Sequence, residues 1–129
     1  MGHLIKLRPE LIKPSQDFLK KGTVDFILDC YKKNKIDSLP PTPLVRKHPN
    51  SKNTYVAIDG HNLLAVSELL GKACEVYIVS SADDYLPNPE NKEPISQRNK
   101  DLTNKYESSV QEADRISCSF KELIKNFIV

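Results

Sequence analysis

The chain lacks several features that define common classes of protein. Its three cysteines, Cys30, Cys74 and Cys118, form no CxxC pair, which argues against a zinc knuckle and against a disulfide framework. No apolar run approaches the roughly 20 residues that a membrane-spanning helix needs. The N-terminus also lacks the basic-then-apolar pattern of a signal peptide. We therefore predict a cytoplasmic protein that makes no membrane contact.

Familiar catalytic patterns are missing as well. The sequence has no pair of catalytic carboxylates, no Ser-His-Asp order and no glycine-rich phosphate loop. Its three histidines, His3, His48 and His61, do not have the spacing of metal ligands on one helix face. We predict no metal ligands among the side chains. The cofactor stays open, with a divalent metal such as Mg²⁺ among the alternatives.

The composition is that of an ordinary globular protein, with 39% hydrophobic and 28% charged residues in 129. The net charge of +2 hides an uneven distribution along the chain. Residues 1–53 carry 11 basic and 5 acidic side chains, whereas residues 54–99 carry 3 basic and 7 acidic ones. A basic first portion suits a polyanion, but a solvated helix face rich in lysine explains it equally well.

Hydrophobic periodicity predicts the order of the elements. An alternating strand over 4–7 precedes a turn with a helix start at Ser15, and an amphipathic helix ends near Asn34. Two strands, 43–47 and 54–58, flank a polar turn and indicate a hairpin. A helix over 62–70 should end at Gly71, and a strand over 73–80 follows.

The last third of the chain has a different character. Three prolines, Pro87, Pro89 and Pro94, mark an irregular connection, and the residues beyond it have helical spacing to the end. Ser119 and Glu122 are spaced as a capping box. The prediction is an α+β fold, a small mixed sheet with packed helices and a helical C-terminal extension. We divide it into a core over 1–82 and, over 83–129, the connection and a helical tail that packs on the core.

The strand-to-helix junction Asp59-Gly60-His61-Asn62 is the strongest candidate site. A helix N-terminus presents backbone N–H groups that favour anions, phosphate above all. Gly60 permits a close backbone approach, His61 titrates near neutrality, and Asn62 is a hydrogen-bonding group. The structural interpretation is simpler: Asp59 caps the helix and Gly60 makes the turn.

Two further groups are candidates for the same ligand. Ser15 and Gln16 follow Pro14 at the predicted helix start, where a hydroxyl and an amide suit an anion. Arg46 opens a basic cluster with Lys47 and His48 and is a candidate phosphate ligand. Each group also has an alternative interpretation that involves no ligand. The first would be a helix cap, and the second would be a solvated basic cluster.

The order of these motifs resembles the ParB/sulfiredoxin superfamily, and most closely its ParB-like nuclease group. Pro14-Ser15-Gln16 is similar to the early Pro-Thr-Gln element of that group. Asp59-Gly60-His61-Asn62 is similar to its Asp-x-His-His element, with Asn62 in place of a histidine. The resemblance covers roughly residues 4–80. It implies a ParB/sulfiredoxin-like fold and a site for phosphate esters.

Departures from the superfamily narrow what the resemblance implies. ParB nucleotide clamps have Gly-Glu-Arg-Arg where this chain has Gly60-His61-Asn62-Leu63, so both arginines are missing. Sulfiredoxins have a nucleophilic cysteine at the position of His61. Free-serine kinases share Asp-Gly-His, but Leu63 replaces their arginine and Gln16 their catalytic glutamate. These three activities are therefore not expected.

Two functions stay open at this point. In the first, a ParB-like nuclease or related phosphate-ester enzyme uses His61 as the acid/base group and Asp59 to orient it. Ser15, Gln16, Gly60, Asn62 and Arg46 would then bind the phosphate or nucleotide. In the second, the chain is a non-catalytic module that binds a nucleotide, a nucleic acid or a protein. Self-association or a protein partner through the C-terminal helices fits either function.

Overall fold

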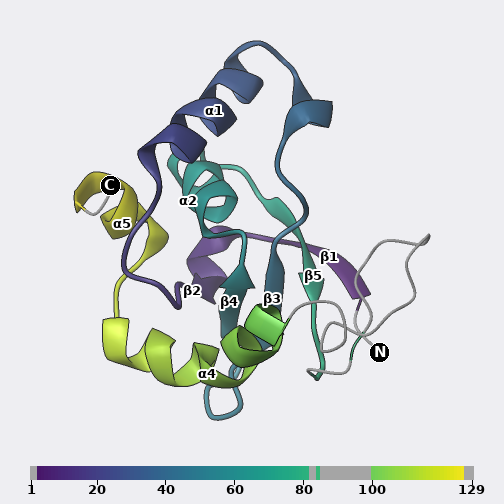
Figure 1. Cartoon of the computed structure of the whole chain (residues 1–129), viewed down its shortest axis with the longest axis vertical. Coiled ribbons are helices and arrows are strands. Elements are labelled where there is room, and N and C mark those ends of the chain that lie inside the picture. Colours follow the sequence, from purple (N-terminus) through teal and green to yellow (C-terminus); the bar gives the residue numbers. More distant parts are fainter. Residues whose placement is uncertain (1–2, 82–83, 85–99, 127–129) are drawn as a thin grey trace.

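The computed structural model describes residues 3–81, 84 and 100–126, and it confirms a mixed α+β architecture (Figure 1). One sheet has the strand order β1-β5-β3-β4-β2. The strands are β1 (His3–Leu7), β2 (Ile12–Lys13), β3 (Leu44–Lys47), β4 (Tyr55–Asp59) and β5 (Cys74–Ile78). The helices are α1 (Lys21–Lys32), α2 (His61–Leu69), α4 (Lys100–Ile116) and α5 (Phe120–Asn126), with short 3-10 turns at Pro9–Leu11 and Ile36–Ser38.

The sheet is mixed because parallel and antiparallel pairs alternate across it. β1 with β5 and β3 with β4 are antiparallel, whereas β3 with β5 and β2 with β4 are parallel. The antiparallel β3–β4 pair confirms the predicted hairpin. From β4 the chain passes directly into α2, as the sequence predicts, and α2 ends before Gly71 in the left-handed conformation, with φ of 67°.

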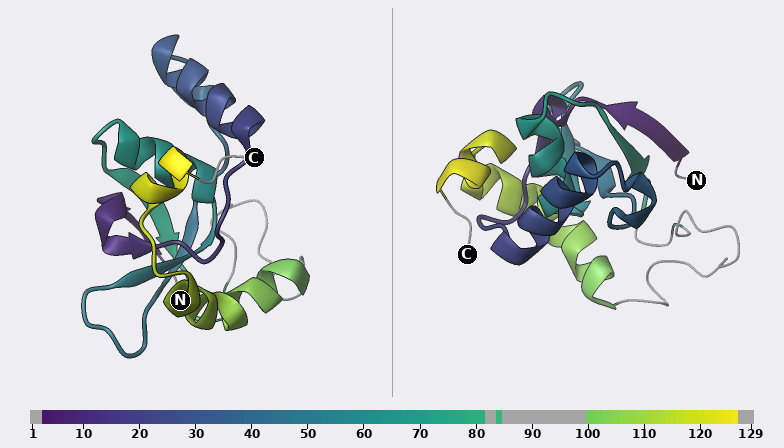
Figure 2. Two further views of the ribbon diagram at one scale, coloured as in Figure 1. Left: turned by 90° about the vertical axis from the view of Figure 1, so that its left-hand side faces the viewer. Right: turned by 90° about the horizontal axis from the view of Figure 1, so that it is seen from above.

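Helices cover both faces of the sheet, and side chains alternate between them along each strand (Figure 2). On one face, buried side chains of β3, β4 and β5 meet α1, α2 and α5 in the main core. Its fully buried members include Val45, Ala57, Val76, Leu64, Ile27 and Phe120. On the other face, Leu44, Ile58, Tyr77 and Val79 form a smaller cluster, and Tyr106 of α4 packs on it.

The helix predicted to start at Ser15 begins six residues later, at Lys21. The amphipathic pattern is confirmed, since Val24, Ile27 and Cys30 are its buried residues. Ser15 lies in a bend instead, because its hydroxyl donates a hydrogen bond to the Ala57 carbonyl of β4. A hydroxyl used in this way is not available as a helix cap.

The C-terminal part of the chain is helical, as predicted, but the helix is interrupted once. α4 and α5 are separated at residues 117–119, where Ser117 has φ of 50°. The Ser119 hydroxyl accepts a hydrogen bond from the Glu122 backbone N–H at 3.1 Å, as the capping-box spacing predicts. Phe120 and Leu123 are buried in the main core, so this apolar stripe packs within the chain. The three prolines of the predicted connection, and Phe127, lie outside the described residues.

Within the described part of the chain, no helix has the length and apolar character required to span a bilayer.

Candidate functional site

The junction between β4 and α2 is built around Gly60. Gly60 is the N-cap of α2, and its φ of 90° lies in the left-handed region. A Cβ added at this position would lie 2.6 Å from the Cβ of Pro43, so the close approach belongs to the protein's own chain. Glycine is therefore required here by conformation and by packing. The predicted cap by Asp59 is wrong, because Asp59 ends β4 and no side chain caps α2.

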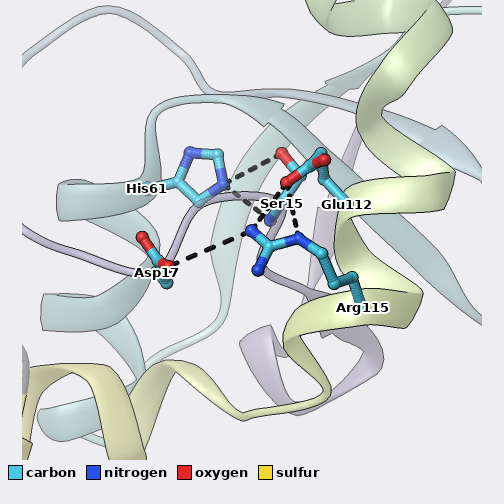
Figure 3. Close-up of polar contacts among 5 residues, drawn as sticks. All are labelled: Ser15, Asp17, His61, Glu112 and Arg115. Carbon is cyan, nitrogen blue, oxygen red and sulfur yellow. Dashed lines mark hydrogen bonds and ion pairs between the residues drawn. The ribbon is translucent and has the colours of Figure 1, made fainter.

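His61 is buried directly behind the junction, with 3% of its surface exposed. Its Nε2 accepts a hydrogen bond from the Ser15 backbone N–H at 3.0 Å (Figure 3). The centre of its ring lies 5.8 Å from that of the Phe120 ring. Loss of hydration, with a smaller contribution from Lys105, lowers the pKa of His61 from 6.5 to about 3. The imidazole is therefore neutral at physiological pH, with its proton on Nδ1.

Asn62 makes a second contact of the same kind. Its Oδ1 accepts a hydrogen bond from the Lys20 backbone N–H at 2.9 Å. The first two residues of α2 thus hold both ends of the segment 15–20. Gln16 lies inside this segment and donates through Nε2 to the Phe18 carbonyl at 3.0 Å.

These contacts explain why the two sequence motifs occur together. The structure brings Ser15 and Gln16 next to the 59–62 junction across more than 40 residues of sequence. His61 and Asn62 act there as hydrogen-bond acceptors that fix the backbone of the 15–20 segment. A histidine used in this way is poorly suited to proton transfer at neutral pH, because its pKa lies far below the working range. A catalytic role for His61 stays a prediction.

An open cleft of about 590 Å³ lies at the N-terminus of α2. Four predicted site residues besides His61 line it, namely Gln16, Asp59, Gly60 and Asn62. Leu63 of α2 also lines it, and the rest of its wall comes from three other places: Phe18, Lys20 and Thr23 near the start of α1, Pro40, Pro41 and Thr42 before β3, and Lys105 of α4. The volume falls in the range of small-ligand sites.

The cleft has a cationic character at this end. Two lysines, Lys20 and Lys105, line it. Among the described residues that form its lining, Asp59 is the one acidic residue. The Lys105 ammonium lies 3.8 Å from the Asp59 carboxylate, and each side chain is about half exposed. Lys105 therefore stays within reach of a ligand. The first N–H groups of α2, which have no acceptor inside the helix, add a partial positive charge.

Arg46, the third predicted phosphate-binding group, does not line this cleft. Its guanidinium donates to the Tyr106 carbonyl at 3.1 Å and lies 4.2 Å from the centre of the Tyr106 ring. This cation–π contact fixes α4 on the hairpin, so the arginine is used in packing. Ser15 is also absent from the cleft lining, because its hydroxyl points to β4.

The end of α4 closes over the bend at Ser15 and Asp17. Arg115 lies between Glu112, 2.8 Å away, and Asp17, 3.9 Å away, on the side facing solvent (Figure 3). All three side chains are largely exposed, so each ion pair contributes little on its own. These ion pairs show that α4 runs along the cleft. Lys105, near the start of α4, lies at Asp59, and Arg115, near its end, lies at the 15–17 bend.

Sequence reasoning missed Lys105, Phe18 and the 40–42 segment. Lys105 lies 46 residues after Asp59, and no local pattern indicates that the two meet. Phe18 precedes an amphipathic helix and lies outside its apolar stripe. A large aromatic residue at such a position is a signal for a ligand-contacting side chain. Within the residues described, no group of three or more His, Cys, Asp or Glu side chains is arranged to hold a metal ion.

Comparison with known proteins assigns no family. No family model matches the chain, and no curated protein matches it. Among solved structures, the chain is similar to the crystal structure of protein Atu1540 from Agrobacterium tumefaciens, with a TM-score of 0.45 and 16% identity. The match covers 60% of this chain and 38% of that chain. A likeness at this level identifies neither a family nor an activity.

Proposed function

We propose that this chain is a non-catalytic ParB-like binding module that holds a phosphate-bearing ligand, a nucleotide or part of a nucleic acid, in the cleft at α2. One observation carries the proposal: the open N-terminus of α2 and two lysines from separate elements line the same cleft of about 590 Å³. Helix amides and lysine ammonium groups are the usual protein ligands of phosphate.

The role of each residue follows from its position. Lys20 and Lys105 supply charge, and the amides of residues 61–63 supply directional donors. Asn62, whose Oδ1 already accepts from Lys20, presents its Nδ2 group as a further donor. Gly60 shapes the turn, while His61 and Ser15 fix the wall of the cleft from behind. None of these roles requires a proton to move.

A phosphate-ester enzyme such as a ParB-like nuclease is the alternative function. It would need His61 to gain and lose a proton near neutral pH, which burial and the neighbouring Lys105 disfavour. It would also need Asp59 to orient that histidine, but the Asp59 carboxylate is paired with Lys105. These observations favour the module.

Equilibrium binding tests the proposal. Calorimetric titration with inorganic phosphate and with nucleotides, with and without Mg²⁺, should show saturable binding without product. Lys20→Gln and Lys105→Gln should each weaken it about tenfold, because each removes a charge-assisted contact. Lys32→Gln, an exposed lysine at the end of α1, is the matched control and should have no effect.

Two results would overturn the proposal. Absence of binding to every phosphate compound would remove the site. Turnover of a nucleotide that is abolished by His61→Gln in a folded variant would establish the enzyme instead.

A further inference from the structure

The apolar part of the cleft has no role in holding phosphate alone. Phe18, Pro40 and Pro41 line the same cavity as the two lysines. Phe18 leaves 39% of its surface exposed, although the burial of a phenyl ring is favourable. An exposed aromatic inside a cleft is a surface on which a flat apolar group of a ligand packs.

Phe18 is held at a defined place relative to the phosphate-binding end. The bonds from Ser15 to His61 and from Lys20 to Asn62 fix the segment on both sides of it, and Gln16 binds its carbonyl. Phe18 and Lys20 are two positions apart in the chain, so their Cα atoms are at most about 7 Å apart. An aromatic surface and a cationic group at this spacing match the two ends of one small ligand.

The charge of the cleft limits the number of phosphates. Two lysines and one aspartate leave one net positive charge, to which the helix end adds about half a unit. A phosphate monoester carries about −1.5 to −2 at neutral pH, which this charge largely balances. Two more phosphate groups would have no cationic partner here. The carboxylate available for an accompanying divalent ion, Asp59, is paired with Lys105.

We propose that the cleft binds a nucleoside monophosphate group. Its base would lie against Phe18, and its phosphate would lie between Lys20, Lys105 and the N-terminus of α2. This inference rests on the phosphate site proposed above and names its ligand class. The monophosphate comes either from a free nucleotide or from the phosphorylated end of a strand, because both present the same base and phosphate.

A series of probes tests each part of this assignment by calorimetry. The wild-type chain is titrated with inorganic phosphate, phenyl phosphate, ribose 5-phosphate, the four nucleoside monophosphates and the matching triphosphates with Mg²⁺. A monophosphate should bind about tenfold more tightly than ribose 5-phosphate, since stacking on an aromatic side chain is worth that much or more. It should also bind more tightly than the triphosphate. A 5′-phosphorylated dinucleotide and its unphosphorylated form show which source binds better, and preference for either phosphorylated source supports the assignment.

Variants at two exposed phenylalanines separate the base contact from general effects. Phe18→Ala should reduce monophosphate affinity to that of ribose 5-phosphate and leave the affinity for ribose 5-phosphate unchanged, while Phe18→Tyr should retain the wild-type value. Phe26→Ala is the matched control, because Phe26 of α1 is 50% exposed and lies outside the cleft lining.

The outcomes distinguish this inference from the proposed function. If ribose 5-phosphate binds as well as any nucleotide, if Phe18→Ala has no effect, or if triphosphates bind best, the base assignment is wrong while the phosphate site stands. If phenyl phosphate binds better than every nucleotide, the aromatic partner is not a nucleobase. If no probe binds at all, the proposed function itself fails.

Discussion

At the scale of single residues, Gly60 is the most constrained position of the site. Its φ lies in the left-handed region, and a Cβ added to it would clash with Pro43, so no side chain fits at this position. Gly60→Ala should therefore lower the free energy of unfolding by at least about 2 kcal/mol, from backbone strain and from the clash together. Chemical denaturation measures this change.

Two other glycines provide controls for the same measurement. At Gly71 the conformation is left-handed but the space is open, so Gly71→Ala should cost only about 1 kcal/mol. Gly22 lies in α1 with ordinary φ and open space, and Gly22→Ala should stabilise the chain by about 0.5 kcal/mol. Equal costs at Gly60 and Gly71 would show that Pro43 is not in contact.

His61 gives the site a predictable dependence on pH. The pKa of His61 falls from 6.5 when unfolded to about 3 when folded, so the unfolded chain binds a proton first as the pH falls. The contribution of His61 to the free energy of unfolding should therefore be constant above pH about 6.5 and decline by about 1.4 kcal/mol per pH unit below it, until the folded pKa is reached.

His61→Gln isolates this contribution, because a glutamine keeps an acceptor for the Ser15 N–H and does not titrate. Between pH 7 and 4.5, the wild type should lose about 2–3 kcal/mol more than the variant in denaturant titrations. Parallel pH profiles for the two proteins would mean that the imidazole is hydrated and open to protons.

At the scale of elements, one carboxylate of α2, that of Glu68, contacts the start of α5. Glu68 accepts a hydrogen bond from the Lys121 backbone at the start of α5, while its Oε2 is buried and has no hydrogen-bond partner among the described residues. Burial and the nearby carboxylate of Glu10 raise the pKa of Glu68, and Glu122 adds to this. The charged form is therefore less stable here than in water.

Replacement by a neutral amide should strengthen the α2–α5 contact. A raised folded pKa means that the stabilisation from protonated Glu68 is present at low pH and lost as the pH rises through that pKa. Glu68→Gln should thus raise the free energy of unfolding by about 0.5 kcal/mol or less at neutral pH, because solvent screens a partly exposed carboxylate, and should have little effect at low pH, where Glu68 is protonated. A variant that is less stable at neutral pH would show that the carboxylate has a cationic partner.

At the scale of the whole molecule, helices and strands were easier to predict from the sequence than the tertiary contacts between them. The spacing of Val24, Ile27 and Leu28 was sufficient for α1, and the apolar run into Gly60 was sufficient for the β4–α2 junction, because such patterns depend on local burial. The start of α1 was wrong because the Ser15 hydroxyl bonds to a strand 42 residues away.

For the candidate site, the sequence indicated residues but not their surroundings. Gln16, Asp59, Gly60 and Asn62 line one cleft with His61, and their role in binding phosphate stays a prediction. Arg46 could not be excluded from sequence, since its direction is set by Tyr106 of α4, 60 residues later. Lys105 reaches the cleft only because α4 packs along β4, and no local pattern indicates such packing.

Binding of a phosphate-bearing ligand at the N-terminus of α2 can be followed by NMR, from the backbone amide chemical shifts of the wild-type chain during titration with a nucleotide. We expect the amides of His61, Asn62 and Leu63 to shift together with that of Lys20 and to saturate at one affinity, with the nucleotide recovered intact. Shifts that leave these four amides unchanged while the nucleotide binds elsewhere, or no shifts at all, would contradict binding at this site.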